Sequence, residues 1–292
     1  MATAVTYRRQ CAEAISAYSG TGYFHGRPWL RVLFEDVPRE LFTPDRVWWH
    51  RRDETGRYPV LDRHRQPDEW LKAVYTPDAA LITQIADGAV RIEDGPTEAS
   101  DFTASISCPA VVVDMLGCLS PRPGQRILEI GTGTGYSTAL MARRIGPSNV
   151  VSVENQPTLA ERAERNLKRD LGRAPLIVTA DGEEGYLPRA PYDGVLSTAC
   201  VYQVPPAWLQ QTKAGGVIVT PLATPWGPDS LVRLVCDGQG GADGELVKPI
   251  YFMKVRGQRE RLKPWKELGW PLWSSYRISV AADGPASIRT AP

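Results

Sequence analysis

Apolar runs and amphipathic segments alternate regularly from residue 126 to residue 221. Runs rich in branched apolar residues predict buried strands at 126–130, 149–154, 176–180, 192–198 and 215–221. Between the second and third runs, apolar residues recur every four positions, which predicts an amphipathic helix closed by Gly172. This alternation predicts an α/β fold with a mostly parallel, doubly wound sheet that binds ligands beyond the carboxyl ends of its strands. Two later runs, 231–236 and 250–255, predict an antiparallel pair at the sheet edge.

The N-terminal third of the chain is expected to be helical and irregular. The pattern predicts helices at 6–19 and 68–75, a strand at 80–85, and a short helical turn at 37–44, where two prolines bracket an apolar pair. The arginine-rich segment 45–64 is expected to be a solvated loop, with direct substrate contact as the alternative. The turn-rich segment 86–101 is expected to be an exposed connection. The Trp-rich tail from Lys263 to Pro292 has no clear pattern.

Composition narrows the class of protein. The 292 residues are enough for a large α/β domain with additions, and the net charge of +1 gives no sign of a nucleic-acid or membrane partner. Scattered cysteines without a C-x-x-C pair indicate reduced thiols rather than disulfides or a zinc site, so no metal is expected. No apolar run reaches the roughly twenty residues of a membrane span, and no signal-peptide core is found near the N-terminus. We therefore expect a soluble, cytoplasmic protein.

The first predicted strand runs into three glycines spaced two apart, Gly131, Gly133 and Gly135. Glycine lets a backbone turn tightly beside a ligand, so this stretch predicts the first nucleotide-binding turn of an α/β sheet. The dinucleotide fingerprint would require glycine at position 136, where this chain has Tyr136. The pattern Glu-x-Gly-x-Gly-x-Gly instead resembles the first motif of S-adenosylmethionine-dependent methyltransferases, whose sulfonium cofactor carries no phosphate.

Acidic residues follow at the ends of the next two predicted strands. Glu154 follows Gly135 at about twenty residues, near the spacing at which a carboxylate reaches both hydroxyls of a ribose. Asp181 and Gly182 end the third strand and fit an edge-on hydrogen bond to adenine. The alternative for Glu154 is a solvated surface acid, and the alternative for Asp181 and Gly182 is a simple turn.

A hydroxyl-rich run, Ser105-Ile106-Ser107-Cys108-Pro109, precedes a helix expected over 110–119. Proline is favoured in the first helical turn, so local signals alone make Ser107 an N-cap whose hydroxyl accepts a backbone N–H. Cys108 lacks an evident base partner and is expected to be a packing residue rather than a nucleophile.

Several separated motifs together resemble the protein-L-isoaspartate O-methyltransferase family over roughly residues 29–255. They are Val-Pro-Arg-Glu-Leu-Phe-Thr-Pro at 37–44, Ser-Ile-Ser-Cys-Pro at 105–109, the glycine stretch at 128–138, Asp-Gly at 181–182, Ala-Pro-Tyr-Asp at 190–193, and the stretch 204–216. The resemblance implies a Rossmann-like class I methyltransferase that binds S-adenosylmethionine, with Ser107 as the active-site residue. The cofactor-binding residues that it implies are Ser105, Glu129, Gly131, Thr132, Gly133, Gly135, Tyr136, Glu154, Asp181 and Gly182.

The same resemblance divides the chain into three expected segments. An N-terminal helical and inserted substrate-side region covers 1–104, the S-adenosylmethionine-binding core covers 105–255, and a C-terminal extension covers 256–292. The repair enzymes of this family usually have threonine where this chain has Ser105, and their compact form lacks the inserted stretch 48–104.

These departures resemble a divergent branch associated with ribosomally made, modified peptides, including graspetide, lasso-peptide and lanthipeptide systems. That branch implies methylation of an ordinary aspartate side chain in a precursor peptide, whose ester then collapses to an aspartimide. Repair of isoaspartyl residues in proteins is the alternative function. A small-molecule methyltransferase and a non-catalytic module that binds the cofactor or a peptide are further alternatives.

Both methylation of aspartate in a precursor peptide and methylation of isoaspartate in repair are chemically consistent with these motifs. A carboxylate is already ionised at neutral pH, since its reference pKa is about 4. It therefore needs no strong general base to attack a sulfonium methyl group, and positioning is the main catalytic task. A serine hydroxyl is adequate to orient one carboxylate oxygen.

Overall fold

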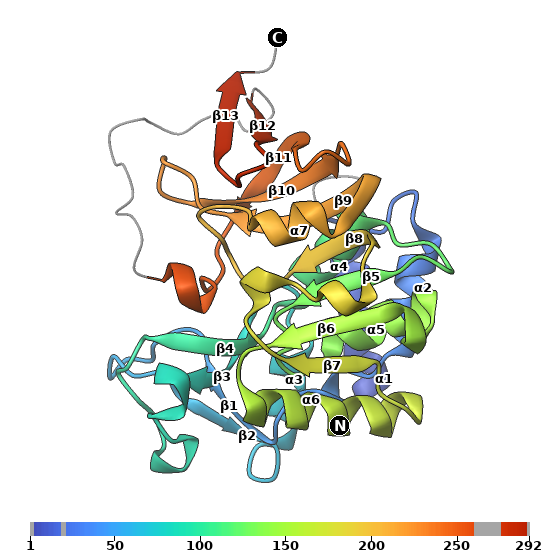
Figure 1. Ribbon diagram of the computed structural model, residues 1–292. Coiled ribbons are helices and arrows are strands. Elements are labelled where there is room, and N and C mark those ends of the chain that lie inside the picture. Colours follow the sequence, from blue (N-terminus) through green and yellow to red (C-terminus); the bar gives the residue numbers. More distant parts are fainter. Residues whose placement is uncertain (1–2, 19–21, 260–275, 291–292) are drawn as a thin grey trace. The chain divides into compact units, whose positions relative to one another are not determined.

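The computed structural model describes residues 3–18, 22–259 and 276–290 (Figure 1). Contacts group the chain into two compact units, and each is described by itself. The first unit comprises Met1–Gly117, Gly133–Arg143 and Arg162–Arg173, and the second comprises Cys118–Thr132, Arg144–Glu161 and Ala174–Pro292. The segment boundaries expected after residues 104 and 255 stay predictions.

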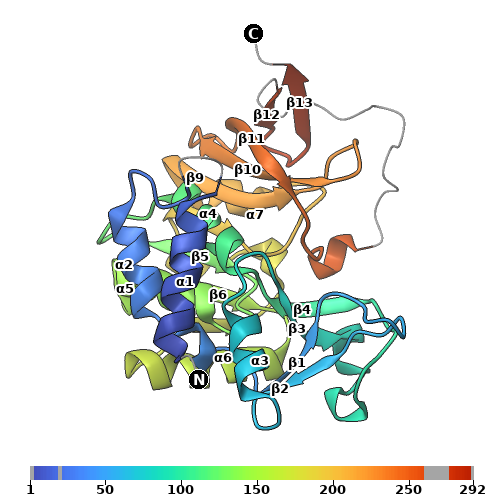
Figure 2. The same ribbon diagram turned by 180° about the vertical axis from the view of Figure 1, so that it is seen from behind.

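The first unit combines helices with a small antiparallel sheet. It holds α1 (Ala4–Ser16), α2 (Pro28–Asp36), α3 (Pro67–Val74), most of α4 (Pro109–Leu119) and α5 (Tyr136–Ile145), the end of α6 (Pro157–Leu171), and the 3-10 turns η1 (Arg39–Leu41), η2 (Ala86–Gly88) and η3 (Ile92–Asp94). Its strands are β1 (Arg46–Trp49), β2 (Val60–Asp62), β3 (Leu81–Ile85) and β4 (Phe102–Ile106), in the order β2-β1-β3-β4. Helices α1 and α2 lie side by side (Figure 2). The turn, helix and strand expected at 37–44, 68–75 and 80–85 are confirmed as η1, α3 and β3.

A charged network fastens α1 to the rest of this unit. Arg8 donates to Glu40 Oε1 at 3.0 Å and to the Tyr75 hydroxyl at 3.0 Å. Tyr75 in turn donates to Glu40. Since Glu40 lies on η1 and Tyr75 follows α3, these bonds tie three separate segments together.

The expectation of a loop at 45–64 is wrong, because β1 and β2 lie within this segment. The two strands pair antiparallel, with Arg46 opposite Asp62 and a 3.4 Å ion pair between their side chains. Trp48 is 1 % exposed and packs against Ile82 and Ile85 of β3. The charges that suggested a solvated loop are cross-strand neighbours on a sheet whose other residues bury an indole.

The second unit is built on a mixed sheet. Its described strands are β5 (Ile127–Ile130), β6 (Val150–Glu154), β7 (Leu176–Thr179), β8 (Tyr192–Ser197), β9 (Thr212–Leu222), β10 (Asp229–Cys236), β11 (Ala242–Ile250), β12 (Tyr276–Val280) and β13 (Ala286–Thr290). Short helical segments complete it: η4 (Pro147–Asn149), η5 (Gly182–Glu184), η6 (Leu187–Arg189), α7 (Pro206–Gln210) and η7 (Arg256–Gln258). The strand order is β13-β12-β11-β10-β9-β8-β5-β6-β7. All five strands expected between residues 126 and 221 are confirmed.

The order of the parallel strands reverses at β5. From β5 the chain proceeds through β6 to β7 on one side and then returns to β8 on the other side, and all these pairs are parallel. The reversal is the topological switch point of a doubly wound sheet, where ligands bind outside the carboxyl ends of the strands. The sheet is thus mostly parallel and doubly wound, as the sequence predicts, with antiparallel strands at one edge.

The antiparallel edge differs from the expected pair. Strand β10 matches the run at 231–236, but its partner β11 covers 242–250 rather than 250–255. Asp237 Oδ1 accepts the backbone N–H groups of Gln239 and Gly241 at 2.6 and 3.0 Å, which closes a tight turn and starts β11 early. Part of the unassigned tail, 276–290, adds β12 and β13, and its residues 263–275 and 291–292 lie outside the described residues.

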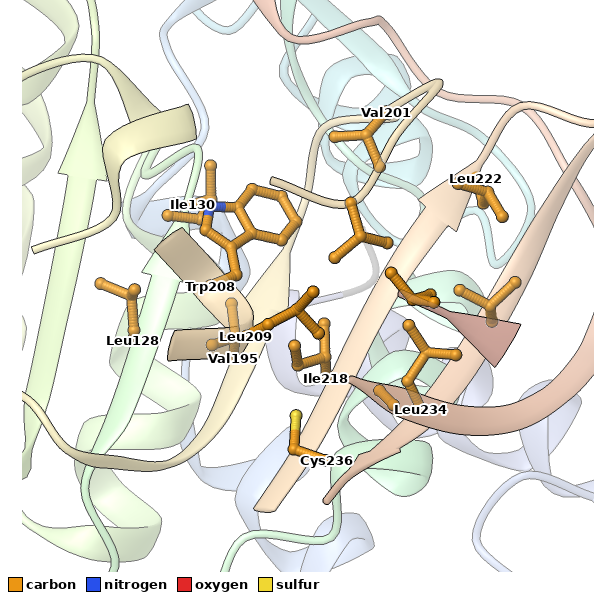
Figure 3. Packing of buried hydrophobic residues seen from close by; sticks show 14 of the residues in the cluster. Leu128, Ile130, Val195, Val201, Trp208, Leu209, Ile218, Leu222, Leu234 and Cys236 are labelled. Carbon is orange, nitrogen blue, oxygen red and sulfur yellow. The ribbon is translucent and has the colours of Figure 1, made fainter. Parts of the chain in front are cut away.

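The core of this unit packs on the sheet around Trp208, whose indole lies beside Ile130 in Figure 3. Apolar side chains from β5, β8, β9, β10 and α7 meet there, including Val195, Leu209 and Ile218. In the part of the chain that the structure describes, no helix is long and apolar enough to cross a membrane.

The five cysteines all lie within the described residues, and no disulfide joins any two of them. Burial raises the pKa of Cys200 from 9.0 to about 12 and that of Cys236 from 9.0 to about 11. The fold thus favours the protonated thiols, and this stabilisation is complete below about pH 9 and is lost as the pH rises toward the folded-state values.

We expect Cys200 and Cys236 to resist alkylation in the native protein at pH 8, because the thiolate is the reactive form and both groups are buried. The partly exposed Cys108 and Cys118 should react first. Iodoacetamide labelling followed by mass spectrometry of peptides, with and without urea, checks this. Labelling of Cys200 in the native protein as fast as that of Cys108 would contradict it.

Candidate cofactor and substrate site

The residues that the sequence predicts for the site fall into both units. Glu129, Gly131, Thr132, Glu154, Asp181 and Gly182 belong to the second unit, and Ser105, Ser107, Gly133, Gly135 and Tyr136 belong to the first. The surroundings of each group are described within its own unit.

The turn after β5 is shaped by a very close approach at Gly131. Gly131 has φ +87°, and a Cβ atom there would lie 2.6 Å from Thr198 Oγ1. Thr198, the residue after β8, donates to the Gly131 carbonyl at 2.6 Å and also contacts the Ile130 carbonyl at 3.2 Å. A side chain at position 131 is therefore excluded both by backbone conformation and by contact. No sequence motif marks Thr198 as a site residue, although its place at the carboxyl end of a strand next to β5 is a signal.

Glu129 holds this turn in place through a chain of buried hydrogen bonds. Its carboxylate is completely buried and its Oε2 accepts from Ser152 Oγ at 2.7 Å. The Ser152 hydroxyl lies 2.6 Å from Thr132 Oγ1. Since Ser152 donates its single proton to Glu129, Thr132 must donate to Ser152. The chain of hydrogen bonds fixes the first polar side chain of the glycine turn to strands β5 and β6.

The carboxyl ends of β6 and β7 lie next to each other in the sheet. Glu154 ends β6 in a buried position, and its Oε1 accepts the Gln156 N–H at 3.1 Å. Its carbonyl accepts from the N–H of Ala180, the residue before Asp181, at 3.1 Å. A buried carboxylate at this strand end is inconsistent with the alternative of a solvated surface acid.

Asp181 and Gly182 form a capped turn that is wedged in place. Asp181 Oδ1 accepts the Glu183 N–H at 3.0 Å and so caps η5. A Cβ atom on Gly182 would lie 2.5 Å from Ile130 Cγ2, and Trp208 Nε1 donates to the Gly182 carbonyl at 2.8 Å. The simple-turn alternative describes the local structure correctly, and contact with adenine stays a prediction.

In the first unit, Ser105 and Ser107 share one face of the β4 segment. The intervening Ile106 and the preceding Ala104 are buried, whereas both serines are partly exposed. The first helical bond of α4 runs from the Val112 N–H to the Cys108 carbonyl at 3.2 Å, so Cys108 rather than Ser107 occupies the cap position. Within the described residues the Ser107 hydroxyl has no hydrogen-bond partner, and this leaves it available to a ligand.

The glycine turn also contacts this strand. A Cβ atom on Gly133, which has φ +55°, would lie 3.7 Å from the Ser105 carbonyl. Gly135, with φ +87°, allows close packing on α6, since a Cβ atom there would lie 3.2 Å from Leu167 Cγ. The second and third glycines thus bring β4, the turn and α6 together.

Arg39 holds the backbone of Ser107 in place. It lies within the Val-Pro-Arg motif, but the sequence did not indicate this role. It is completely buried, and its Nη2 donates to the Ser107 carbonyl at 2.7 Å and to the Ile106 carbonyl at 3.3 Å. Its Nε donates to the Val74 carbonyl at 2.9 Å. Burial lowers the pKa of Arg39, an effect that Tyr136 opposes. The strand end that carries Ser107 is therefore held by its backbone.

Tyr136 serves as a packing residue on the other side of Arg39. Its ring centroid lies 5.0 Å from Arg39 Cζ and 5.8 Å from the Phe42 ring. Such a desolvated cation–π contact contributes about 2 kcal/mol. Burial raises the pKa of Tyr136. In the described residues neither its hydroxyl nor Arg39 Nη1 has a hydrogen-bond partner. The side chain of Tyr136 thus contacts Arg39 and Phe42, and any cofactor contact of this residue stays a prediction.

These features fit S-adenosylmethionine. The turn lacks side chains at the glycines, and a buried carboxylate stands at the end of β6, where a ribose would lie. Among the described residues no group of three or more His, Cys, Asp or Glu side chains is placed to hold a metal ion.

We expect Gly131→Ala to weaken cofactor binding at least about tenfold and to lower the free energy of unfolding by more than the roughly 1–2 kcal/mol of backbone strain alone. Gly124→Ala is the matched control, because Gly124 has φ +84° but open space around its Cβ position. Urea unfolding and calorimetric titration with S-adenosylhomocysteine check both. Equal losses in the two variants would show that the Thr198 contact has no effect.

We expect Arg39→Met to lower the free energy of unfolding by about 3 kcal/mol or more, because three carbonyls, two of them buried, lose their donor. Arg39→Lys should lie between this variant and the wild type. Arg31→Lys, at a half-exposed surface pair with Glu35, is the control and should change stability by less than about 0.5 kcal/mol. Urea unfolding measures all three, and a neutral Arg39→Met would contradict the proposed support of Ser107.

Comparisons with known proteins agree with this geometry. The family model described as protein-L-isoaspartate(D-aspartate) O-methyltransferase (PCMT) matches residues 75–260. The chain is 37 % identical over 152 residues to the protein-L-isoaspartate O-methyltransferase of Ignicoccus hospitalis, which covers 52 % of this chain and 72 % of the relative. It is 42 % identical over 171 residues to the enzyme of the same name from Methanospirillum hungatei, covering 59 % and 78 %.

Two solved structures share the fold. A protein-L-isoaspartate O-methyltransferase superposes with a TM-score of 0.61 at 25 % identity, covering 85 % of this chain and 65 % of the other. A putative protein-L-isoaspartate O-methyltransferase from Plasmodium falciparum, in complex with S-adenosyl-L-homocysteine, gives a TM-score of 0.61 at 14 % identity, covering 86 % and 99 %, which shows the fold alone. The chain therefore belongs to the protein-L-isoaspartate O-methyltransferase family of S-adenosylmethionine-dependent protein carboxyl methyltransferases.

Proposed function

We propose that this protein transfers a methyl group from S-adenosylmethionine to the carboxylate of isoaspartyl residues in proteins or peptides. The observation that carries this proposal is Ser107, whose backbone is held by buried Arg39 while its hydroxyl has no hydrogen-bond partner in the described residues. The family match at 75–260 includes both Ser107 and the glycine turn.

The residues of the chain would act by positioning. When bound, S-adenosylmethionine supplies an electrophilic methyl group on its sulfonium centre. The Ser107 hydroxyl donates a hydrogen bond to one oxygen of the substrate carboxylate and leaves the other oxygen free to attack. Because a carboxylate with a pKa near 4 is ionised at neutral pH, no side chain has to remove a proton.

We assign the remaining site residues to the cofactor. Glu154 would accept from the ribose hydroxyls, and the Asp181–Gly182 turn would contact adenine. Ser105, Gly131, Gly133 and Gly135 would form the wall beside the methionine part. Glu129, Thr132 and Tyr136 would keep that wall in shape through their buried contacts.

An ordinary aspartate in a modified, ribosomally made peptide is the second candidate substrate. The feature that favours it is the stretch before residue 75, which lies outside the family match and contains β1, β2 and α3. The relatives described above favour isoaspartate instead, since both are protein-L-isoaspartate O-methyltransferases. We therefore rank protein repair above the biosynthetic role.

Two peptides of identical sequence, one with isoaspartate and one with aspartate, separate these functions. With labelled S-adenosylmethionine we expect methylation of the isoaspartyl peptide at least about 100-fold faster, as measured by kcat/KM. Efficient esterification of the aspartyl peptide, followed by loss of methanol, would contradict the repair function and support the biosynthetic function. Cofactor binding without transfer to either peptide would support a non-catalytic module.

We expect Ser107→Ala to lower kcat/KM for the isoaspartyl peptide by about 10²-fold, because one oriented hydrogen bond to the reacting group is lost. Binding of S-adenosylhomocysteine should stay unchanged. The same substitution at the exposed Ser100 is the matched control and should leave both quantities unchanged. Full activity of Ser107→Ala would remove Ser107 from the catalytic role.

A further inference from the structure

A cavity of about 590 Å³ opens in the second unit and is used by none of the residues assigned above. Tyr202, which follows β8, and Leu222, which ends β9, line it. Strands β8 and β9 are parallel neighbours on one side of β5, so their carboxyl ends lie at the same edge of the sheet as Gly131. With strands spaced about 4.8 Å apart, the cavity begins within about 10–15 Å of the glycine turn.

Aromatic side chains form part of the wall of this cavity. Tyr202, Trp226, Tyr251 and Phe252 all line it, and a volume of several hundred Å³ suits a ligand of a few residues. Tyr251 is 75 % exposed, so most of its ring is accessible to a ligand. The Trp226 ring is fixed by Tyr276, whose ring centroid lies 4.9 Å away.

The charged groups in the cavity neutralise each other. Asp229 Oδ1 accepts from Lys254 Nζ at 2.6 Å, and Asp229 is 6 % exposed. Lys254 Nζ also lies 5.5 Å from the Tyr202 ring centroid. Burial lowers the pKa of Lys254, but the hydrogen bond and ion pair with Asp229 oppose it and the pKa is raised overall, so Lys254 stays charged and paired. A ligand with its own buried charge would find no opposite charge to compensate it, which favours an uncharged ligand.

Part of the wall comes from the C-terminal extension. Ala286 and Ile288 of β13 line the cavity, and both lie outside the residues 75–260 that match the family. The cavity is therefore completed by a strand that the family match does not include.

We propose that this cavity binds an aromatic side chain of the peptide substrate, one that lies close in sequence to the methylated residue. The proposal rests on the proposed function for the identity of the substrate. Aromatic rings are the best partners for four aromatic walls, because edge and face contacts add to the burial of apolar area.

Equilibrium binding tests the proposal without turnover. Isoaspartyl peptides that differ only by Phe or Ala, placed at each position up to about four residues from the isoaspartate, are titrated calorimetrically into the protein with S-adenosylhomocysteine. We expect Phe to tighten binding about tenfold at one of these positions. Tyr251→Ala should remove most of this preference and leave the Ala peptides unaffected.

Leu187→Ala is the matched control, because Leu187 is 71 % exposed in the same unit but does not line the cavity. Trp226→Ala, checked for folding by circular dichroism, tests a deeper wall. Equal binding of Phe and Ala peptides by the wild type overturns the proposal, as does a preference that survives both Tyr251→Ala and Trp226→Ala. A cavity-dependent preference without methyl transfer would instead refute the proposed function alone.

Discussion

The site in the second unit depends on one close contact: the residue after β8, Thr198, lies against the residue after β5, Gly131. Thr198 hydrogen-bonds the carbonyls of the two consecutive residues Ile130 and Gly131, so the chain leaves β5 in one direction only. That direction delivers Thr132 to Ser152 and, through it, to buried Glu129. It also leaves Ile130 facing Gly182, where a larger residue would collide. The ends of three strands are thereby fixed by contacts that involve almost no exposed side chain.

In the first unit, the buried charged side chain of Arg39 fixes the backbone of separate segments. Arg39 has no carboxylate partner in the described residues, and three backbone carbonyls and the face of Tyr136 replace one. Burying an arginine is costly unless its donors are satisfied. Its position links the Val-Pro-Arg motif directly to the strand that carries Ser105 and Ser107.

Much of the fold could be predicted from sequence because local periodicity reports which faces are buried. The strands from β5 to β9 and the glycine turn follow from such local signals. Strands β1 and β2 could not, because their charges pair across strands, as Arg46 does with Asp62. The same limit hid Arg39 and Thr198, whose partners lie far along the chain. Glu129 and Tyr136 were found by motif, but only the structure reveals their buried contacts.

The way Arg39 holds β4 has a consequence for how this site can be studied and changed. The Arg39 guanidinium donates to the backbone carbonyl of Ser107, so this contact does not depend on the Ser107 side chain. Any amino acid that tolerates the end of a strand would receive the same support. Position 107 is thus a natural point for chemical editing, where a thiol, an amide or a hydrogen atom can replace the hydroxyl while the scaffold stays the same.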